Sequence, residues 1–318
     1  MAALLSLGAG SSLPTHHPEW FAPVDPLHVA GPIWYVGTQD LGVYLITTPA
    51  GHILIDGAMP GSGPAIAASI EKAGFKPEDI KQLLITHAHV DHVGTAAWFK
   101  KMTHAPLAAM APDDALLASG GRADYLFAKD KEFRFPPVTV DRVLHDGDTV
   151  TLGDVTLTAR HTPGHTRGGT TWVMPIDDGG RSYNVVFPCS TSINPGTRLV
   201  NDPSYPGIAD DYRRSLDILI GLNPDIWLPA HASFFDLAGR RARMATEGTQ
   251  AFVDPSGFRD RIAQQREKLE AAIVEETGGT PPAADAAAGG HVRSCVSRGG
   301  HLSPSLQADG RIYESEPH

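Results

Sequence analysis

The sequence predicts an α/β fold in which short buried strands alternate with helices. Apolar runs of strand length recur along the chain, and each is bounded by Gly, Pro or polar residues. A segment with helical spacing separates the early runs from the later ones, which is the alternation typical of α/β proteins. With 42% hydrophobic residues in a chain of 318, a sizeable core can be buried.

Two β-rich runs lead into a helix in the first third of the chain. Residues 34–49 (WYVGTQDLGVYLITTP) and 51–57 (GHILIDG) have the composition of strands, joined by a Pro-Ala-Gly turn. PAIAASIEKAG follows with helical spacing, and Pro64 and Gly74 are typical of its start and its end. QLLIT then predicts a short buried strand that leads directly into His87.

Polar residues follow this strand and three later ones. VTLTAR is followed by HTPGHT with His165, NVVFP by CSTS, and DIWLPA by His231. Loops beyond the carboxyl ends of strands commonly carry function in α/β sheets, because the sheet holds them rigidly. A single histidine in such a loop is more often a packed or surface residue than a ligand. Their recurrence at matching strand ends favours a shared site instead.

The most specific motif is HAHVDH at residues 87–92. In a turn that enters a helix, His87 and His89 can face one ion while Asp91 and His92 point to a neighbouring one. Imidazole and carboxylate ligands without thiolate suit Zn²⁺, with Mn²⁺ or Fe²⁺ as alternatives. Two ions about 3.5 to 4 Å apart form a clamp used in hydrolysis. The motif therefore predicts a metal site, with zinc as the first choice.

Charge and composition exclude several classes of partner. A formal net charge of -10 and a pI near 5.8, without a basic cluster, argue against nucleic acid. The apolar runs stay far below the roughly 18 residues of a membrane span, so no membrane partner is expected.

Two cysteines, Cys189 and Cys295, form neither a disulfide framework nor a zinc-thiolate site. Residues 1–19 lack a basic start, which leaves a truncated signal peptide and a disordered N-terminus both open.

HAHVDH, the downstream TPGHT and the later strand-end histidine together resemble the metallo-β-lactamase superfamily. The resemblance covers residues 20–277 and implies a four-layer αββα sandwich with a dinuclear site along one edge of the sheets. It assigns His87, His89 and His165 to a first zinc ion. A second zinc ion would be held by Asp91, His92 and His231.

The residues after NVVFP bear on the choice within the superfamily. Many members that hydrolyse thioesters, lactones or RNA have an aspartate there that bridges the metals, whereas this chain has FPCSTS with Ser190 at that position. A one-residue slip in the alignment would bring Cys189 to the metal instead. The histidine-only first site and the stretch LITTPAGHILID are similar to subclass B3. That similarity implies hydrolysis of penicillins, cephalosporins and carbapenems, and a periplasmic or secreted location. A lactonase or thioesterase, and a non-catalytic metal-binding protein, are the alternatives.

The same resemblance suggests roles for four residues. Asp91 would orient the attacking water while it ligates the second ion. Ser190 and Ser192 would donate hydrogen bonds to the substrate's carboxylate, or else merely satisfy a turn after the strand. Asp56 would support the metal loop or a ligand imidazole, the alternative being a turn cap.

The remaining segments give weaker indications. Residues 122–137, named here the aromatic segment, would either cover the cleft or pack in the ordinary way. A helix is expected from Asp254 to Glu276, followed by a linker and disordered tail over residues 278–318. His52 and the other histidines outside the motifs are expected at the surface, and a monomer is favoured.

Overall fold

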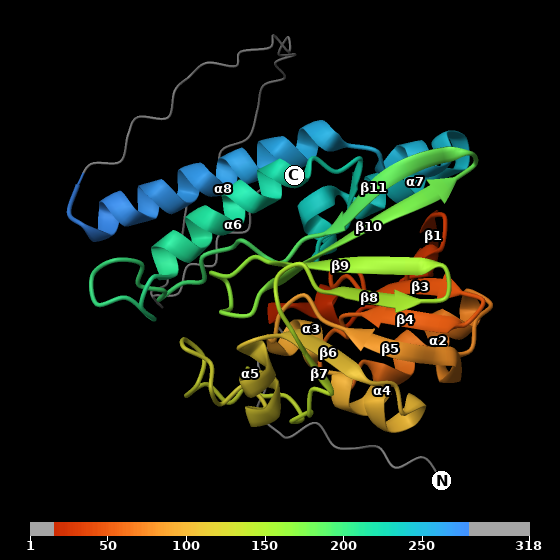
Figure 1. The fold of residues 1–318 in the computed structure, drawn as a ribbon, viewed down its shortest axis with the longest axis horizontal. Helices are drawn as coiled ribbons and strands as arrows, with labels where there is room; N and C mark the ends of the chain where they lie inside the picture. Colours follow the sequence, from red (N-terminus) through yellow and green to blue (C-terminus); the bar gives the residue numbers. More distant parts are fainter. Residues whose placement is uncertain (1–15, 280–318) are drawn as a thin grey trace, which may run out of the picture. The chain divides into compact units, whose positions relative to one another are not determined.

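Two β-sheets face each other, and helices cover the outer side of each sheet (Figure 1). A computed structural model describes residues 16–279 of the chain. One apolar core contains residues of both sheets, including Ile55 and Trp172, and the second lies between the first sheet and its helices. The expected αββα sandwich is therefore confirmed.

The first sheet has seven strands and is mixed. They pair in sequence order: β1 (Leu27–Ala30), β2 (Ile33–Tyr35), β3 (Tyr44–Thr48), β4 (Gly51–Ile55), β5 (Ile80–Leu84), β6 (Leu107–Met110) and β7 (Arg142–Leu144). The pairs from β1 to β4 are antiparallel, whereas those from β4 to β7 are parallel. The parallel half leaves the carboxyl ends of β4, β5 and β6 at one edge of the sheet.

The second sheet has five strands in the order β12-β11-β10-β9-β8. Their bounds are β8 (Thr149–Leu152), β9 (Val155–His161), β10 (Thr170–Asp178), β11 (Arg181–Phe187) and β12 (Ile226–Trp227). Only β12 pairs in parallel, with β11, so both of these strands end at the same edge.

Helices form the two outer layers. Their bounds are α2 (Gly63–Lys72), α3 (Val90–Val93), α4 (Ala96–Thr103), α5 (Asp113–Ser119), α6 (Ile208–Leu222), α7 (Leu237–Glu247) and α8 (Pro255–Glu276), with short 3-10 turns η1 (Pro18–Trp20), η2 (Pro77–Asp79), η3 (Ala232–Phe235) and η4 (Gly248–Phe252). Ile66 of α2 and Phe99 of α4 pack on the first sheet. Helices α6 and α8 lie side by side (Figure 1). Their residues Leu216 and Ile262 pack in the core that contains residues of both sheets.

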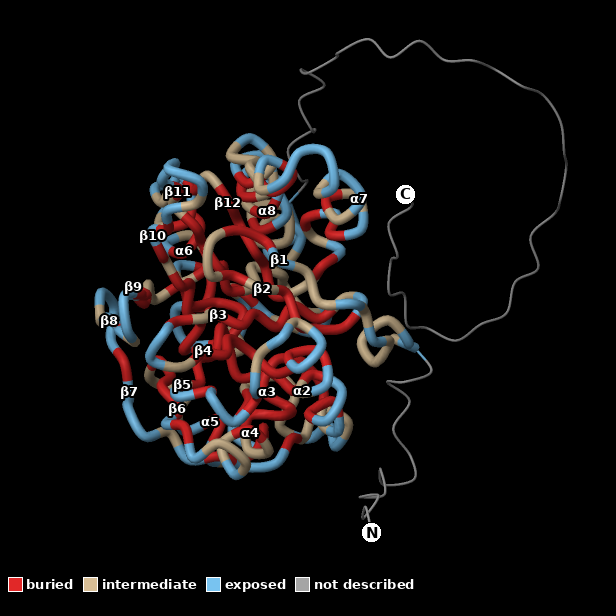
Figure 2. The backbone as a smooth tube through the Cα atoms, turned by 90° about the vertical axis from the view of Figure 1, so that its right-hand side faces the viewer, coloured by how far each residue is buried: buried red, intermediate tan, exposed pale blue. Residues whose placement is uncertain are grey.

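The apolar run of β4 follows from burial on both of its faces. Ile53 and Ile55 point into the core shared by the two sheets, while Leu54 points into the core beneath the helices. Successive side chains of a strand alternate between its faces, so a central strand needs apolar residues at consecutive positions. Figure 2 shows the buried tube running through the strands of both sheets.

The last helix begins and ends where the sequence predicts. Asp254 caps α8, since its Oδ1 accepts a hydrogen bond from the Gly257 N–H at 2.9 Å. Most of the expected tail over residues 278–318, and of the expected segment 1–19, lies outside the described residues. Within residues 16–279, no helix is both long and apolar enough to cross a membrane.

The structure differs from two sequence expectations. Residues 34–49 do not form one continuous run, because the backbone folds around the Tyr35 hydroxyl, which donates to the carbonyls of Thr38 and Leu41 at 2.6 and 2.9 Å. His52 was expected at the surface but is buried, with its ring 5.2 Å from that of Phe75. Its position in a central strand explains this burial.

Hydrogen bonds join the two sheets at the edge where the polar loops gather. The Thr170 N–H donates to the carbonyl of Thr86 at 2.7 Å, and the Trp172 indole donates to the carbonyl of Ile85 at 2.9 Å. These contacts fix the segment that leaves β5 against the strands of the second sheet. The histidine motif follows this segment directly.

Candidate metal centre

The HAHVDH loop changes direction between its second and third histidines. His89 has an extended backbone with φ -93° and ψ 156°, and α3 begins at the next residue. His87 and His89 therefore project from an extended segment, whereas Asp91 and His92 project from a helical turn. One short loop thus supplies side chains to two neighbouring clusters.

The first cluster contains His87, His89 and His165. One nitrogen of each imidazole lies within 4.8 Å of the others. The Nδ1 atom of His89 is 3.1 Å from Nε2 of His165. All three side chains are buried, and the loop after β9 contributes the third.

The second cluster contains Asp91, His92 and His231. Asp91 Oδ2 lies 3.1 Å from His92 Nε2 and 3.4 Å from His231 Nε2. The rings of His87 and His92 are 4.3 Å apart, so the two clusters adjoin. The six residues that the sequence singled out are thus brought together as two groups of three.

Protein groups contact the other nitrogen of four of the five imidazoles. Four contacts have short distances: Thr86 Oγ1 to His87 Nδ1 at 3.0 Å, Asp124 Oδ2 to His89 Nε2 at 3.3 Å, the Ser192 carbonyl to His165 Nδ1 at 2.7 Å, and Asp40 Oδ2 to His231 Nδ1 at 2.9 Å. Asp56 Oδ2 lies further away, 3.8 Å from His92 Nδ1. Such contacts fix the orientation of an imidazole and leave its remaining nitrogen for a metal.

The residues present fit a metal ion. His87 Nε2 and both ring nitrogens of His92 are buried and have no hydrogen-bond partner among the described residues, although His92 Nε2 lies 3.1 Å from Asp91 Oδ2. Buried polar atoms are rarely left unpartnered, because their desolvation costs free energy. Five imidazoles and one carboxylate form the donor set that Zn²⁺ prefers when thiolates are absent.

Burial and neighbouring charges shift the pKa values of the clustered histidines in different directions. Burial lowers the pKa of His165 to about 3 and that of His87 well below its usual range. Burial also opposes the charged form of His231, but hydrogen bonds to Asp40 and Asp91 outweigh it and raise its pKa to about 9. His87 and His165 are therefore already in the neutral form that ligates metals. Burial also opposes the charged form of His89, but its hydrogen bond to Asp124 outweighs this and raises its pKa.

Comparisons with known proteins identify the family. The family model described as the metallo-β-lactamase superfamily matches residues 43–231. The chain belongs to the metallo-β-lactamase superfamily. The protein is accordingly a hydrolase of this metal-dependent superfamily.

Solved structures similar to this chain include subclass B3 metallo-β-lactamases. FEZ-1 from Legionella gormanii is 42% identical with a TM-score of 0.79, and the match covers 81% of this chain and 98% of that one. BJP-1 of Bradyrhizobium japonicum, described as a subclass B3 metallo-β-lactamase, is 39% identical with a TM-score of 0.77, covering 82% and 97%. A class B3 di-zinc enzyme from an Alaskan soil metagenome, LRA-12, is 36% identical with a TM-score of 0.76, covering 80% and 96%.

The curated relatives match a smaller part of this chain than the solved structures do. The hydroxyacylglutathione hydrolase of Rhodopseudomonas palustris is 31% identical over 169 residues, which are 53% of this chain and 54% of that protein. The chain thus spans about half the length of the curated relatives it matches.

Asp113 fastens the two loops that supply the first cluster of this metallo-β-lactamase superfamily protein. Its fully buried carboxylate accepts hydrogen bonds from the Ala88 N–H at 3.0 Å and from the Thr166 hydroxyl and the Gly168 N–H at 2.7 Å. A side chain on Gly168 would meet Asp113 at 2.6 Å, so glycine is needed for this close approach. Both loops are therefore held in register by one carboxylate.

The serines that follow β11 lie beside the first cluster. Ser190 Oγ donates to Ser192 Oγ at 3.2 Å, and the Ser192 carbonyl also accepts from the Tyr212 hydroxyl at 2.9 Å. Cys189 belongs to neither cluster of the described residues, and burial raises the pKa of its thiol well above its usual range. The structure therefore brings the six predicted histidine and aspartate ligands together without Cys189.

Asp56 contacts both Thr86, which precedes the HAHVDH loop, and His92 of the second cluster. Its two carboxylate oxygens accept hydrogen bonds from the N–H and the hydroxyl of Thr86 at 2.7 and 2.8 Å. Burial raises its pKa to about 6, although His92 and Thr86 favour the ionised form. Asp56 thus contacts the metal loop and also faces a histidine of the second cluster.

Different parts of the aromatic segment have the two roles considered for it, covering the site and packing in the core. Phe127 stacks on Phe133 with ring centroids 3.9 Å apart and meets the His89 ring at 5.5 Å. Phe135 is instead 5% exposed and belongs to the core beneath the helices. One part of the segment covers the first cluster and another part packs in the ordinary way.

Sequence reasoning missed Asp40, Asp113 and Asp124. All three contact the candidate ligands or the loops that hold them. Asp113 opens a helix, where acidic residues are common, and the other two lie in loops without a recognisable spacing. These three residues are recognised by their contacts with residues distant in the sequence, and such contacts become visible only once the fold is known.

Proposed function

We propose that the protein is a zinc-dependent hydrolase that opens the β-lactam ring of penicillins, cephalosporins and carbapenems. The observation that carries the proposal is the histidine-only first cluster beside a second cluster in which Asp91 is the sole carboxylate. Ser190 stands where many superfamily hydrolases have a bridging aspartate. The likeness to subclass B3 structures at 39 to 42% identity supports the same activity.

The six clustered residues would hold two zinc ions: His87, His89 and His165 one ion, and Asp91, His92 and His231 the other. When bound, zinc supplies Lewis acidity that polarises a carbonyl group and lowers the pKa of water. Burial opposes the ionisation of Asp91, but His92 and His231 hold its pKa well below its usual range. Its carboxylate therefore stays ionised, accepts a hydrogen bond from the attacking water and fixes the orientation of that water.

Ser190 and Ser192 are proposed to bind the carboxylate of the substrate. Their hydroxyl oxygens are 3.2 Å apart and half-buried. The Ser190 hydroxyl, which donates to Ser192 Oγ in the free protein, would turn so that both hydroxyls donate to one anionic group. Residues 20–277 form the catalytic domain in this proposal, and one protomer suffices because a single chain supplies both clusters. The subclass resemblance favours a periplasmic or secreted location.

A thioesterase is the second candidate. It is favoured by the curated relatives, which include a hydroxyacylglutathione hydrolase. The absence of a bridging aspartate at Ser190 argues against it. A lactonase of the same fold is disfavoured for the same reason, and a non-catalytic metal-binding protein would not need both complete clusters.

The test is hydrolysis of a chromogenic cephalosporin and a carbapenem by purified zinc-loaded protein, with and without a chelator. Turnover should disappear with chelator and in His89→Ala, but persist in His145→Ala, whose side chain is 79% exposed. A lactone and a glutathione thioester complete the substrate set. Turnover of the thioester without opening of either drug would replace the β-lactamase proposal with the thioesterase.

A further inference from the structure

Asp40, whose carboxylate contacts His231, belongs to a tight loop of residues 38–41, named here the Asp40 loop. Two hydrogen bonds between its first and last residues close this loop. The Thr38 N–H donates to the Leu41 carbonyl at 3.0 Å, and the Leu41 N–H donates to the Thr38 hydroxyl at 2.9 Å. The orientation of Asp40 therefore depends on what holds this loop in place.

The hydroxyl of Tyr35 holds the Asp40 loop from inside the core. It donates to the carbonyls of Thr38 and Leu41 at 2.6 and 2.9 Å, and the tyrosine side chain is fully buried. Burial raises the pKa of this phenol well above its usual range, so the hydroxyl keeps the proton that it donates. A buried carbonyl that loses its donor costs free energy. The conformation that turns both carbonyls towards the core therefore depends on Tyr35.

The Asp40 loop also pairs with the backbone that carries His231. Leu41 and His231 form an isolated antiparallel bridge. The Ala232 N–H donates to the Asp40 carbonyl at 2.6 Å. Both the imidazole of His231 and the backbone around it are therefore tied to the position of this loop.

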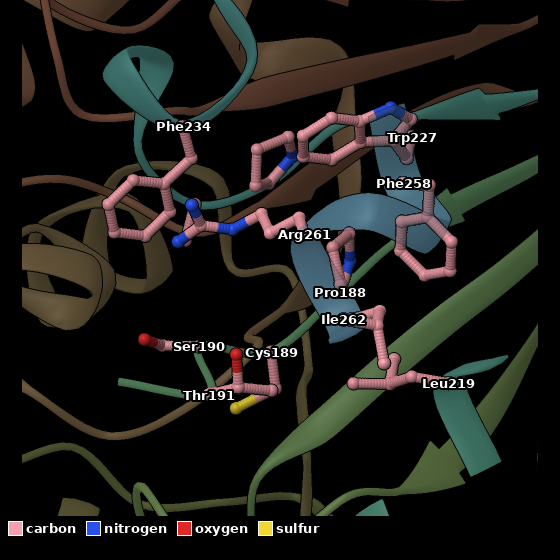
Figure 3. Close-up of a pocket in the computed structure, with 12 residues that line it drawn as sticks. Pro188, Cys189, Ser190, Thr191, Leu219, Trp227, Phe234, Phe258, Arg261 and Ile262 are labelled. Carbon is pink, nitrogen blue, oxygen red and sulfur yellow. The ribbon is translucent and has the colours of Figure 1, made fainter. Parts of the chain in front are cut away.

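A second buried tyrosine holds the segment that leads to His231. The Tyr44 hydroxyl donates to the Pro229 carbonyl at 2.7 Å. The same segment borders a pocket whose lining includes Trp227 and Phe234 (Figure 3). Atoms that border a pocket have fewer packing partners, so the hydrogen bond from Tyr44 matters more for the position of this segment. If Tyr35 lost its hydroxyl, the Asp40 loop would lose its anchor while the segment before His231 kept its own.

We propose that Tyr35 is a positioning residue for the second zinc site, and that its hydroxyl acts by fixing Asp40 against His231. The inference rests on the proposed function, in which His231 holds the second ion. Without the hydroxyl, the Asp40 loop gains access to conformations in which the carboxylate no longer lies 2.9 Å from His231 Nδ1. The imidazole is then less firmly oriented, and its Nε2 atom is a weaker ligand.

The test compares Tyr35→Phe with the control Tyr183→Phe. Tyr183 is also buried, lies near the start of β11, and its hydroxyl accepts a hydrogen bond from Gln250 Nε2 at 2.6 Å. Each substitution removes one buried hydroxyl and keeps the ring, so the melting temperatures should fall by similar amounts. In stepwise zinc titration against a chromogenic chelator, only Tyr35→Phe should weaken the second ion, by about tenfold. The affinity for the first ion should stay within about twofold in both variants.

A second measurement uses metal-free protein. The His231 Nδ1 proton that is donated to Asp40 gives an NMR resonance, which is identified by its shift in Asp40→Asn. It should be sharp in wild type and in Tyr183→Phe, but broadened or lost in Tyr35→Phe. An unchanged resonance in Tyr35→Phe, an unchanged affinity for the second ion, or equal weakening of both ions overturns the proposal. If the wild type binds two zinc ions but opens no β-lactam, the proposed function fails, while the titration and the resonance still decide the role of Tyr35.

Discussion

The Oδ2 atom of Asp40 lies 2.9 Å from Nδ1 of His231 across a sequence separation of 191 residues. The other carboxylate oxygen of Asp40 accepts from the Ser233 N–H, also at 2.9 Å. Asp40 therefore fixes both the imidazole and the backbone that follows it. Burial opposes its ionisation, but His231 and Ser233 lower its pKa to about 2.

Asp40→Asn should weaken binding of the second zinc ion by about tenfold to a hundredfold, as expected when the carboxylate behind a histidine ligand is lost. Affinity for the first ion should stay within about twofold, because Asp40 contacts no residue of the first cluster in the described structure. Stepwise zinc titration against a chromogenic chelator separates the two affinities. Equal weakening of both ions would contradict a local role.

Asp124 has the corresponding position behind the first cluster. Its Oδ2 lies 3.3 Å from His89 Nε2, and its Oδ1 accepts from the N–H groups of Leu126 and Phe127 at 2.7 Å. Asp124→Asn should therefore weaken the first zinc ion by about tenfold or more and leave the second near wild type. The same titration checks this result, with Asp40→Asn as the matched control. An unchanged first affinity would assign Asp124 to the loop alone.

Most of the fold could be predicted from the sequence because its signals are local. The continuous apolar run of β4, the proline and glycine that bound α2, and the cap of α8 each depend on neighbouring residues. The loop after β2 was not predictable in the same way, since it depends on the buried hydroxyl of Tyr35. The composition of a strand does not predict such hydrogen bonds.

Part of the candidate site could likewise be predicted from the sequence. His87, His165 and His231 follow strands, and parallel or adjacent strand ends meet at one edge once the sheets form. Asp40 and Asp124 approach the histidines from distant loops whose conformations follow from tertiary packing. Spacing along the chain therefore found the inner groups but not the groups that orient them.

Asp113→Ala should destabilise the protein by about 3 kcal/mol or more, because three buried donors lose one acceptor. Those donors are the N–H groups of Ala88 and Gly168 and the hydroxyl of Thr166. Urea unfolding of chelator-treated protein measures the effect without a contribution from bound metal. Asp114→Ala, at the next position of the same helix, should change stability by less than about 1 kcal/mol. Similar losses for both variants would contradict the proposed fastening role.

Two glycines should respond to alanine in opposite directions. A Cβ atom on Gly94 would lie 2.2 Å from the backbone nitrogen of Pro60, and that segment cannot move freely since the Gly94 N–H bonds to the Ala58 carbonyl at 2.8 Å. Gly94→Ala should cost about 2 to 3 kcal/mol. Gly221 is exposed in α6 and has open space around it, so Gly221→Ala should stabilise by about 0.5 to 1 kcal/mol. Thermal unfolding in the absence of metal distinguishes the two signs.

Asp254 combines the cap of α8 with an ion pair to the buried guanidinium of Arg240, at 2.6 Å. Asp254→Asn keeps a good capping residue and removes the charge, so it isolates the ion pair. The loss should be about 2 kcal/mol at neutral pH, below the value for fully buried pairs, because the Asp254 side chain is 30% exposed.

The pH dependence of this loss has a definite sign. Burial opposes ionisation of Asp254, but the Gly257 N–H and Arg240 lower its pKa below the ordinary value of 3.8. A carboxyl with a lowered folded-state pKa contributes its full stability above the unfolded-state value and loses it as the pH falls through the folded-state value. The stability difference between wild type and Asp254→Asn should therefore be constant above about pH 5 and shrink below pH 3.8. Urea unfolding from pH 3 to 7 measures it, and a difference that grows towards low pH would contradict the ion-pair explanation.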